Sequence, residues 1–159
     1  MISISFEIID EPPRLISTER MPYPIDKVWL AETDAWYVQQ WWAPTDYIND
    51  AVEIAMEEGG YWRVIQRDPE GHQFSFYGRV DKVIPRELFR MTLTSEIFPE
   101  DQILVTQQFV ASGPGTIVAT TWEFPNAAAL NRYVALGGPE RQKGASARLD
   151  ALLSQMLPK

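Results

Sequence analysis

The first eight residues alternate between apolar and polar side chains. The apolar positions are Ile2, Ile4, Phe6 and Ile8, and the polar positions between them are Ser3, Ser5 and Glu7. This period of two is typical of a strand with one buried face. Pro12 and Pro13 end the run, because proline cannot donate to a strand ladder. We predict an edge strand within an N-terminal extension, residues 1–13, and a second extended segment over residues 14–21.

Two short helices are predicted after this extended segment. Pro24 fits the first turn of a helix over residues 25–32, since its missing N–H would have no partner there in any case. Asp34 is placed to cap a second helix over residues 35–41, and Pro44 ends the unit. The sequence therefore indicates a helical pair inserted between strands.

The middle of the chain consists of extended runs separated by turn residues. The turn sequences are EEGG at 57–60, DPEG at 68–71, IPRE at 84–87, FPED at 98–101 and SGPG at 112–115. The strands predicted around them cover residues 52–56, 61–67, 74–83, 88–96, 103–111 and 116–124. Connections this short favour sequential antiparallel hairpins, because parallel crossovers need a longer helical segment.

A connector of polar and small residues and an amphipathic helix follow Pro125. The connector contains Gly137-Gly138-Pro139, and the helix carries apolar residues at helical spacing: Ala145, Leu149, Leu152, Leu153 and Met156. The order of elements predicts one α+β domain over residues 1–159, a length that suits a single core. In it a curved antiparallel β-sheet wraps around a long C-terminal α-helix, with two short helices after the first strand.

Such an arrangement predicts a cavity, because a straight helix crossing a strongly twisted sheet leaves space beneath it. The strand alternation puts mostly aromatic and aliphatic side chains on the inner face, with Gln107 and Thr120 as polar exceptions. Apolar walls with a few polar groups are typical of small-molecule sites. The predicted ligand-binding residues are Trp41, Trp62, Phe76, Phe89, Met91, Gln107, Phe109, Thr120, Trp122, Ala145 and Leu149. The alternative, that these residues simply form the core, stays open.

The assignment of inner and outer faces decides what the cavity can bind. The alternation directs Arg63, Arg79 and Glu123 to solvent. A slip of one residue in register would move both arginines inside and create an anion site.

The composition of the chain argues against several kinds of binding partner. The net charge is −8 and the basic residues are scattered, which argues against nucleic acid, since its binding depends on clustered Lys and Arg. The chain has no cysteine, so disulfides and zinc–thiolate sites are excluded. Residues 1–13 lack the features of a signal peptide, and no stretch approaches the roughly 20 apolar residues of a membrane span. We expect a cytoplasmic protein without a membrane partner.

The chemistry-bearing residues give little sign of a catalytic or metal site. His72 is the only histidine and falls on a predicted hairpin tip, where a catalytic triad or metal would be exposed. Glu57, Glu58 and Glu70 fit solvated turn charges better than a cation cage. Glycine motifs for nucleotide phosphates are missing from the sequence, so we expect neither a metal nor a cofactor.

Trp41 and Trp42 are the most suggestive pair. Because adjacent indoles on a short helix cannot both face the core, we expect one of them at the cavity mouth or on a partner surface.

Five segments resemble a known family. They read PIDKVWLAETDAWYVQQWWAP, EIAMEEGGYWRV, YGRVDKVIPRELFRMT, GTIVATTWEF and KGASARLDALLSQML. In this order and spacing, over about Arg14 to Leu157, they resemble the SRPBCC superfamily (START/Bet v-like). Within it they are similar to the bacterial family named after the activator of the heat-shock-protein-90 ATPase. The resemblance implies the helix-grip fold. That family commonly has Gly-Trp where this chain has Gly144-Ala145, which predicts a larger pocket here.

Three classes of function remain. The first is binding of a small apolar or aromatic ligand. The second, implied by the resemblance, is a polyketide cyclase or dehydratase, which would need Gln107, Thr120 or an inward carboxylate of raised pKa for acid–base work. The third is a co-chaperone-like module that binds a protein partner through the sheet or the Trp41-Trp42 region. Homodimerisation through the N-terminal edge strand is a further alternative.

Overall fold

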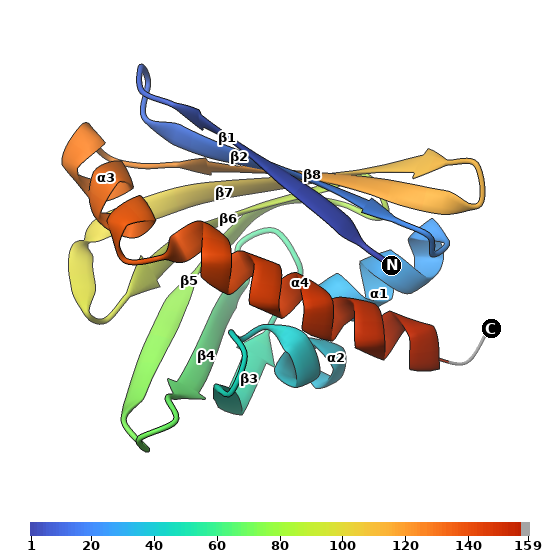
Figure 1. Cartoon of the computed structure of the whole chain (residues 1–159), viewed down its shortest axis with the longest axis horizontal. Helices are drawn as coiled ribbons and strands as arrows, with labels where there is room; N and C mark the ends of the chain where they lie inside the picture. The colour runs from blue at the N-terminus through green and yellow to red at the C-terminus, as the bar shows by residue number, and fades with distance from the viewer. Residues whose placement is uncertain (157–159) are drawn as a thin grey trace.

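The computed structural model describes residues 1–156, which form eight strands and four helices (Figure 1). The strands are β1 (Ser3–Ile9), β2 (Arg14–Met21), β3 (Ile48–Ile54), β4 (Tyr61–Arg67), β5 (Gln73–Ile84), β6 (Leu88–Ser95), β7 (Phe98–Ser112) and β8 (Gly115–Glu123). The helices are α1 (Ile25–Thr33), α2 (Ala35–Trp41), α3 (Ala127–Ala135) and α4 (Gly138–Gln155). Residues 157–159, which end the predicted domain and include the last residue of the family resemblance, lie outside the described residues.

These strands form one antiparallel sheet in the order β1-β2-β8-β7-β6-β5-β4-β3. From β3 to β8 each strand pairs with the next, as short turn connections favour. The β1–β2 hairpin joins beside β8, so that β1 and β3 are the two edges. The predicted α+β fold and its antiparallel meander are confirmed.

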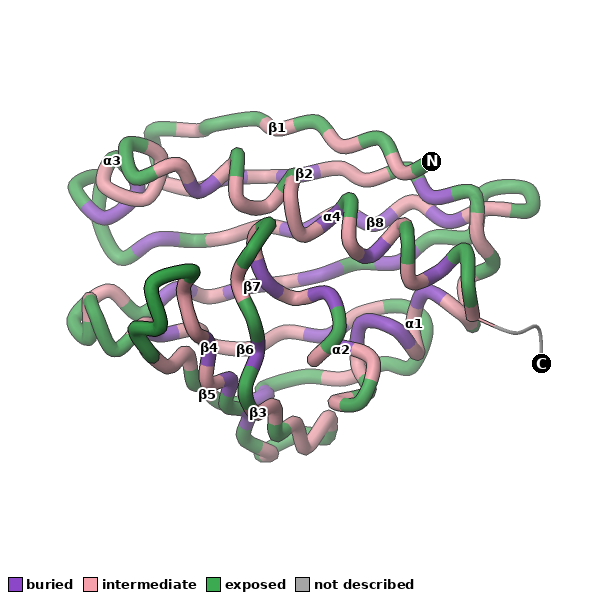
Figure 2. The backbone as a smooth tube through the Cα atoms, turned by 60° about the horizontal axis from the view of Figure 1, so that its bottom comes forward, coloured by how far each residue is buried: buried purple, intermediate pink, exposed green. Residues whose placement is uncertain are grey.

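The sheet is bent, and α4 crosses its concave face (Figures 1 and 2). Register shifts occur between Asn49 and Ala51 in β3, within β5 and within β6. Irregularities of this kind bend a strand and increase its twist. The helix-grip arrangement follows, with α1, α2 and α4 on the same side of the sheet.

The buried face of α4 anchors the core. Leu149 and Leu153 have no exposed surface and pack with Val28 and Ala31 of α1. A second cluster, around Leu130 of α3, fills the other end of the sheet. Full burial of a leucine side chain contributes about 1.5–3 kcal/mol, so these contacts hold α1 and α4 against the sheet.

Arg148 ties α4 to the end of α2. Its guanidinium donates to the backbone carbonyls of Gln40, Ala43, Pro44 and Tyr47 at 2.9–3.3 Å. A helix leaves its last carbonyls without internal partners, and arginine offers several donors in a fixed plane. One side chain thereby fixes the Trp41-Trp42 element relative to α4.

Three local predictions were wrong. The supposed connector after Pro125 contains α3, because the side chain of Asn126 accepts a hydrogen bond from the backbone N–H of Ala129 (2.8 Å) and caps a run of alanines. Strand β7 begins at Phe98, since Ser95 pairs with Phe98 and the turn lies at residues 96–97 rather than at FPED. Strand β3 covers Ile48–Ile54, whereas the strand was predicted over residues 52–56.

Gly78 on β5 lets a tryptophan lie flat against the sheet. A Cβ at this position would collide with the carbonyl of Thr92 and lie 2.8 Å from Nε1 of Trp62. That indole nitrogen donates to the same carbonyl of Thr92 at 2.9 Å. The glycine therefore leaves room for a buried indole to be hydrogen-bonded on the inner face.

Candidate cavity between the sheet and the helices

Three adjoining cavities lie between the inner face of the sheet and the helices. The outer cavity has a volume of about 690 Å³, the middle cavity about 170 Å³ and the deep cavity about 50 Å³. The residues that line both the outer and the middle cavity are Gln66, Phe76, Leu93, Ile103, Tyr133 and Arg141. Trp42, Met91 and Gln107 line both the middle and the deep cavity. Because neighbouring cavities share several lining residues, the three cavities form one row that runs from the surface into the core.

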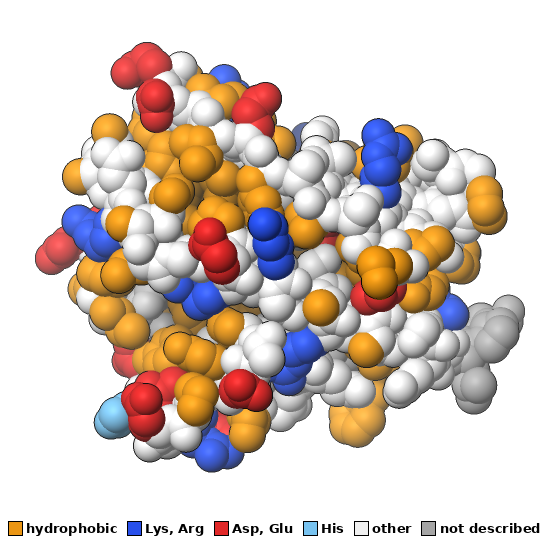
Figure 3. Space-filling view, in the orientation of Figure 1, with side chains coloured by type: hydrophobic (Ala, Val, Ile, Leu, Met, Phe, Trp, Pro, Cys, Tyr) orange, Lys and Arg blue, Asp and Glu red, His pale blue; other side chains and the backbone are white. Residues whose placement is uncertain are grey.

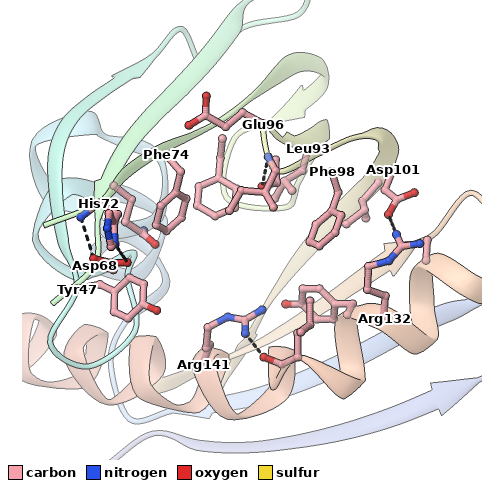
Figure 4. Close-up of a pocket in the computed structure, with 18 of the residues that line it drawn as sticks. Tyr47, Asp68, His72, Phe74, Leu93, Glu96, Phe98, Asp101, Arg132 and Arg141 are labelled. Carbon is pink, nitrogen blue, oxygen red and sulfur yellow. Dashed lines mark hydrogen bonds and ion pairs between the residues drawn. The ribbon is translucent and has the colours of Figure 1, made fainter. Parts of the chain in front are cut away.

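Two arginines reach into the outer cavity from the helices, while apolar side chains come from the strands (Figure 4). Arg132 of α3 pairs with Asp101 and lies over the ring of Phe98, 5.0 Å from its centroid. Arg141 of α4 donates to the carbonyl of Leu136. Hydrophobic side chains gather around α3 and the neighbouring strands, with charged groups between them (Figure 3). The mouth is therefore apolar with a charged rim.

The middle cavity has aromatic walls. Trp42 packs edge-on against Trp62 and Phe76, with ring centroids 5.8 and 5.3 Å apart. Trp122 of β8 and Ala145 of α4 complete the lining. Such walls offer area and shape to a flat apolar molecule.

The deep cavity ends at a buried carboxyl group. Glu32 of α1 is only 8% exposed, and its Oε1 accepts a hydrogen bond from Nε2 of Gln107 at 2.6 Å. Its other oxygen, Oε2, is buried without a hydrogen-bond partner among residues 1–156. A buried carboxyl oxygen without a partner is costly, so this atom marks a place where a partner would be gained.

A second carboxyl group lies close to the first. Glu19 of β2 accepts a hydrogen bond from Oγ of Ser146 on α4 at 2.8 Å. Ser17, two residues earlier, has a buried hydroxyl with no partner in the described part of the chain. Ser17 lies opposite Thr120, which lies opposite Gln107. These residues give the inner face a polar row across β2, β8 and β7.

Burial decides the charge state of both acids. It raises the pKa of Glu32 well above its ordinary value of 4.5, the charge on Glu19 raises the pKa further, and the hydrogen bond from Gln107 opposes the rise. Burial also raises the pKa of Glu19, opposed by the hydrogen bond from Ser146. Both shifts favour the neutral form of the acid, and Glu32 is the more strongly affected of the two.

The eleven residues predicted to line a ligand site divide into two groups. Eight line at least one of these cavities: Trp41, Trp62, Phe76, Phe89, Met91, Gln107, Trp122 and Ala145. The other three, Phe109, Thr120 and Leu149, line none of the three and are buried in the core. Phe109 is covered by Trp29 of α1, with ring centroids 5.0 Å apart, which explains why it does not reach the cavity. Whether the eight bind a ligand stays a prediction.

In the tryptophan pair, Trp41 is buried and Trp42 is partly buried, and both line the cavities. Trp41 is 8% exposed and its Nε1 donates to the carbonyl of Ala31 at 2.8 Å. Trp42 follows the last residue of α2 and leaves the helical conformation, with ψ at 63°. That change redirects its ring into the middle cavity.

The charged residues of the strands lie on the outer face. Arg63, Arg79 and Glu123 are exposed, as predicted from the alternation.

Sequence reasoning missed the two acids and the residues from α3. Glu19 continues the inward alternation of Leu15, Ser17 and Met21, and Glu32 follows buried Val28 by one helical turn. Both positions could have been read as inward from this spacing. Arg132 and Tyr133 were missed because α3 was not predicted.

One cluster in residues 1–156 could approach a metal ion. Asp68, Glu70 and His72 place one ligand atom each within 4.8 Å of the others on the β4–β5 hairpin. The carboxylate of Asp68 already accepts the backbone N–H groups of Glu70 and His72, at 3.0 and 2.9 Å. These bonds hold the turn, and Glu70 and His72 are exposed.

Comparisons with known proteins agree with the fold. The family model described as "Activator of Hsp90 ATPase homolog 1-like protein" matches residues 22–155. A Rhodobacter sphaeroides crystal structure superposes with a TM-score of 0.89 at 19% identity, covering 97% of this chain and 100% of that one. A Mycobacterium smegmatis structure gives a TM-score of 0.86 at 19% identity, covering 99% and 100%.

A third similar structure is that of a protein from a biosynthetic locus. DynU16, described as a protein in the dynemicin biosynthetic locus, gives a TM-score of 0.67 at 21% identity, covering 89% of this chain and 47% of that one. At these identities the structures establish the shared fold alone. A comparison with curated proteins finds no match. None of the helices within residues 1–156 has the length and apolar character of a membrane span.

Proposed function

Because the chain belongs to the family of activator of Hsp90 ATPase homolog 1-like proteins, we propose that it binds a small apolar or aromatic molecule between the sheet and α4. The observation that carries the proposal is the row of three adjoining cavities, which leads from an open mouth to a buried polar end. The SRPBCC-like fold commonly holds hydrophobic ligands, which supports it further.

The size and lining of the cavities suit such a ligand. Small-molecule pockets usually measure about 300–1,000 Å³, and the outer cavity alone, at about 690 Å³, falls in this range. Phe74, Phe76, Leu93 and Ile103 give it apolar walls. Ala145 lines the middle cavity where the family commonly has tryptophan, so a smaller side chain leaves more room there.

Native mass spectrometry of the freshly purified protein, followed by a thermal-shift screen, tests the proposal. The screen uses fatty acids, aromatic metabolites and polyketide-like compounds. A co-purifying small molecule, or a rise in Tm that grows with the concentration of one compound, is the expected result, because a ligand that binds only the folded state stabilises it. An empty protein with no shift for any compound would count against ligand binding.

A substitution on α4 makes the test specific to the cavity. Ala145→Trp places an indole in the middle cavity and should abolish the thermal shift without lowering the Tm of the free protein, since it fills space rather than displacing side chains. Ala147→Trp, two residues later on the exposed side of the same helix, is the matched control and should bind as the wild type does. Equal loss of binding in both variants would place the ligand elsewhere.

The buried acid favours a second candidate function. A neutral Glu32 beside Gln107, at the end of an apolar cavity, is the type of group that general-acid catalysis requires. Chemistry similar to that of a polyketide dehydratase would use it to protonate the leaving hydroxyl, which departs as water. The carboxylate formed would take up the α proton as the C=C bond forms, so that neutral Glu32 is restored. Incubation of the protein with β-hydroxy ketones tests this candidate: mass spectrometry would detect loss of water from the substrate with the wild type but not with Glu32→Gln.

A further inference from the structure

We propose that the deep cavity recognises a carbonyl oxygen of the bound molecule, and that Glu32 donates the hydrogen bond from Oε2. This inference rests on the proposed ligand binding and adds the class of ligand. The ligand would be a flat apolar ring compound with a carbonyl group at one end, oriented with that group toward α1.

The hydrogen bond from Gln107 determines which oxygen of Glu32 is free. The amide nitrogen of Gln107 can only donate, so Oε1 of Glu32 acts as the acceptor in their 2.6 Å contact. In the neutral acid the proton then resides on Oε2, the oxygen that has no partner among the described residues. The geometry therefore presents one O–H donor that is already oriented and lacks an acceptor.

The surroundings of Glu32 keep it neutral, and its side chain lines the deep cavity, although Oε2 itself is buried. The charge of a second acid, Glu19, disfavours ionisation of Glu32. Glu32 and Gln107 both line the deep cavity, and Gln107 also lines the middle one. An acceptor entering from the middle cavity would reach this donor after a small rotation of the side chains that cover Oε2.

The walls between the two cavities select for a flat body. Trp42 and Met91 line both, and Trp62 and Phe89 line the deep end. Aromatic faces and edges pack well against a planar ring system. The deep cavity, at about 50 Å³, is small, so it has room for a polar end group while the rings stay in the middle cavity.

A pair of probes that differ in one group tests the inference. 2-Acetylnaphthalene and 2-ethylnaphthalene have the same ring system and nearly the same shape, but only the first has a carbonyl. Isothermal titration calorimetry should give a dissociation constant about tenfold lower for the ketone, because one additional hydrogen bond to a buried donor has roughly this effect. The variant Glu32→Met should lose this preference while it still binds 2-ethylnaphthalene. Glu32→Gln should keep most of it, because an amide N–H can donate from the same place.

Infrared spectroscopy provides a measurement that needs no variant. The stretching frequency of a ¹³C-labelled ketone carbonyl bound to the wild-type protein should lie below its frequency in an apolar solvent such as hexane, since a hydrogen bond weakens the C=O bond. A band at the hexane frequency, or equal affinity of the wild type for both probes, would overturn the role of Glu32 while leaving ligand binding intact. Failure of both probes to bind would refute the proposed function together with this inference.

Discussion

The buried acid Glu32 should make the stability of the protein fall as the pH rises above about 4.5. Because burial and Glu19 raise its pKa, the folded protein holds a proton on Glu32 at pH values where the unfolded chain, with an ordinary pKa of 4.5, has lost it. The folded state then binds more protons, and the free energy of unfolding decreases with increasing pH. The decrease begins near pH 4.5 and ends at the folded pKa of Glu32.

The slope of this decrease in the free energy of unfolding approaches about 1.4 kcal/mol per pH unit for one titrating group. This is the free-energy equivalent of one unit of pKa. Glu32→Gln removes the titrating group, so the difference in free energy of unfolding between wild type and variant should fall with pH by up to this slope. Asp50 and Asp68, whose pKa values are lowered from 3.8, lose their contribution only at lower pH and affect both proteins equally.

Urea titrations followed by tryptophan fluorescence at pH 5, 6, 7 and 8 measure the effect. Glu7→Gln, an exposed acid on β1, is the matched control and should run parallel to the wild type. Glu19→Gln removes the negative charge beside Glu32 and should therefore shift the end of the decrease to lower pH. If the Glu32→Gln and wild-type curves are parallel over this range, Glu32 has an ordinary pKa and the reasoning fails.

Two further substitutions test local features of the fold by urea unfolding. Asn126→Ala removes the N-cap of α3 and should cost about 1 kcal/mol; no loss would mean that packing alone holds the helix. Gly78→Ala should cost about 1–3 kcal/mol, because its methyl group collides with the carbonyl of Thr92 and displaces the hydrogen bond of Trp62; a variant as stable as the wild type would contradict this reading.

The sheet could be predicted because its signals are local. Strand β4, for example, alternates with a period of two between turns rich in glycine and proline, and it pairs with its sequence neighbours β3 and β5. The inward positions followed from the same alternation. This is why residues such as Trp62 and Trp122 were placed correctly on the inner face, where they line the cavities.

The site was less predictable because its polar end depends on contacts between distant segments. Glu32 and Gln107 are 75 residues apart, and a glutamate on a helix normally faces solvent unless a partner is known. Trp42 reaches the cavity only because the backbone leaves the helix at that residue. Helix α3 packs on Leu15 and Phe124, so tertiary contacts support a segment whose composition suggested a loop.

The strand order imposes a sequence of events on folding. Strands β3 to β8 can pair as each one follows the last, but the N-terminal hairpin has its place beside β8, where Arg14 lies opposite Glu123. Closing so long a loop costs chain entropy before any contact is gained, which slows folding. Until β8 forms, the edge of β2 that will face it has no partner and can pair with another chain. Slow refolding and aggregation at high protein concentration should therefore originate at the β2–β8 junction.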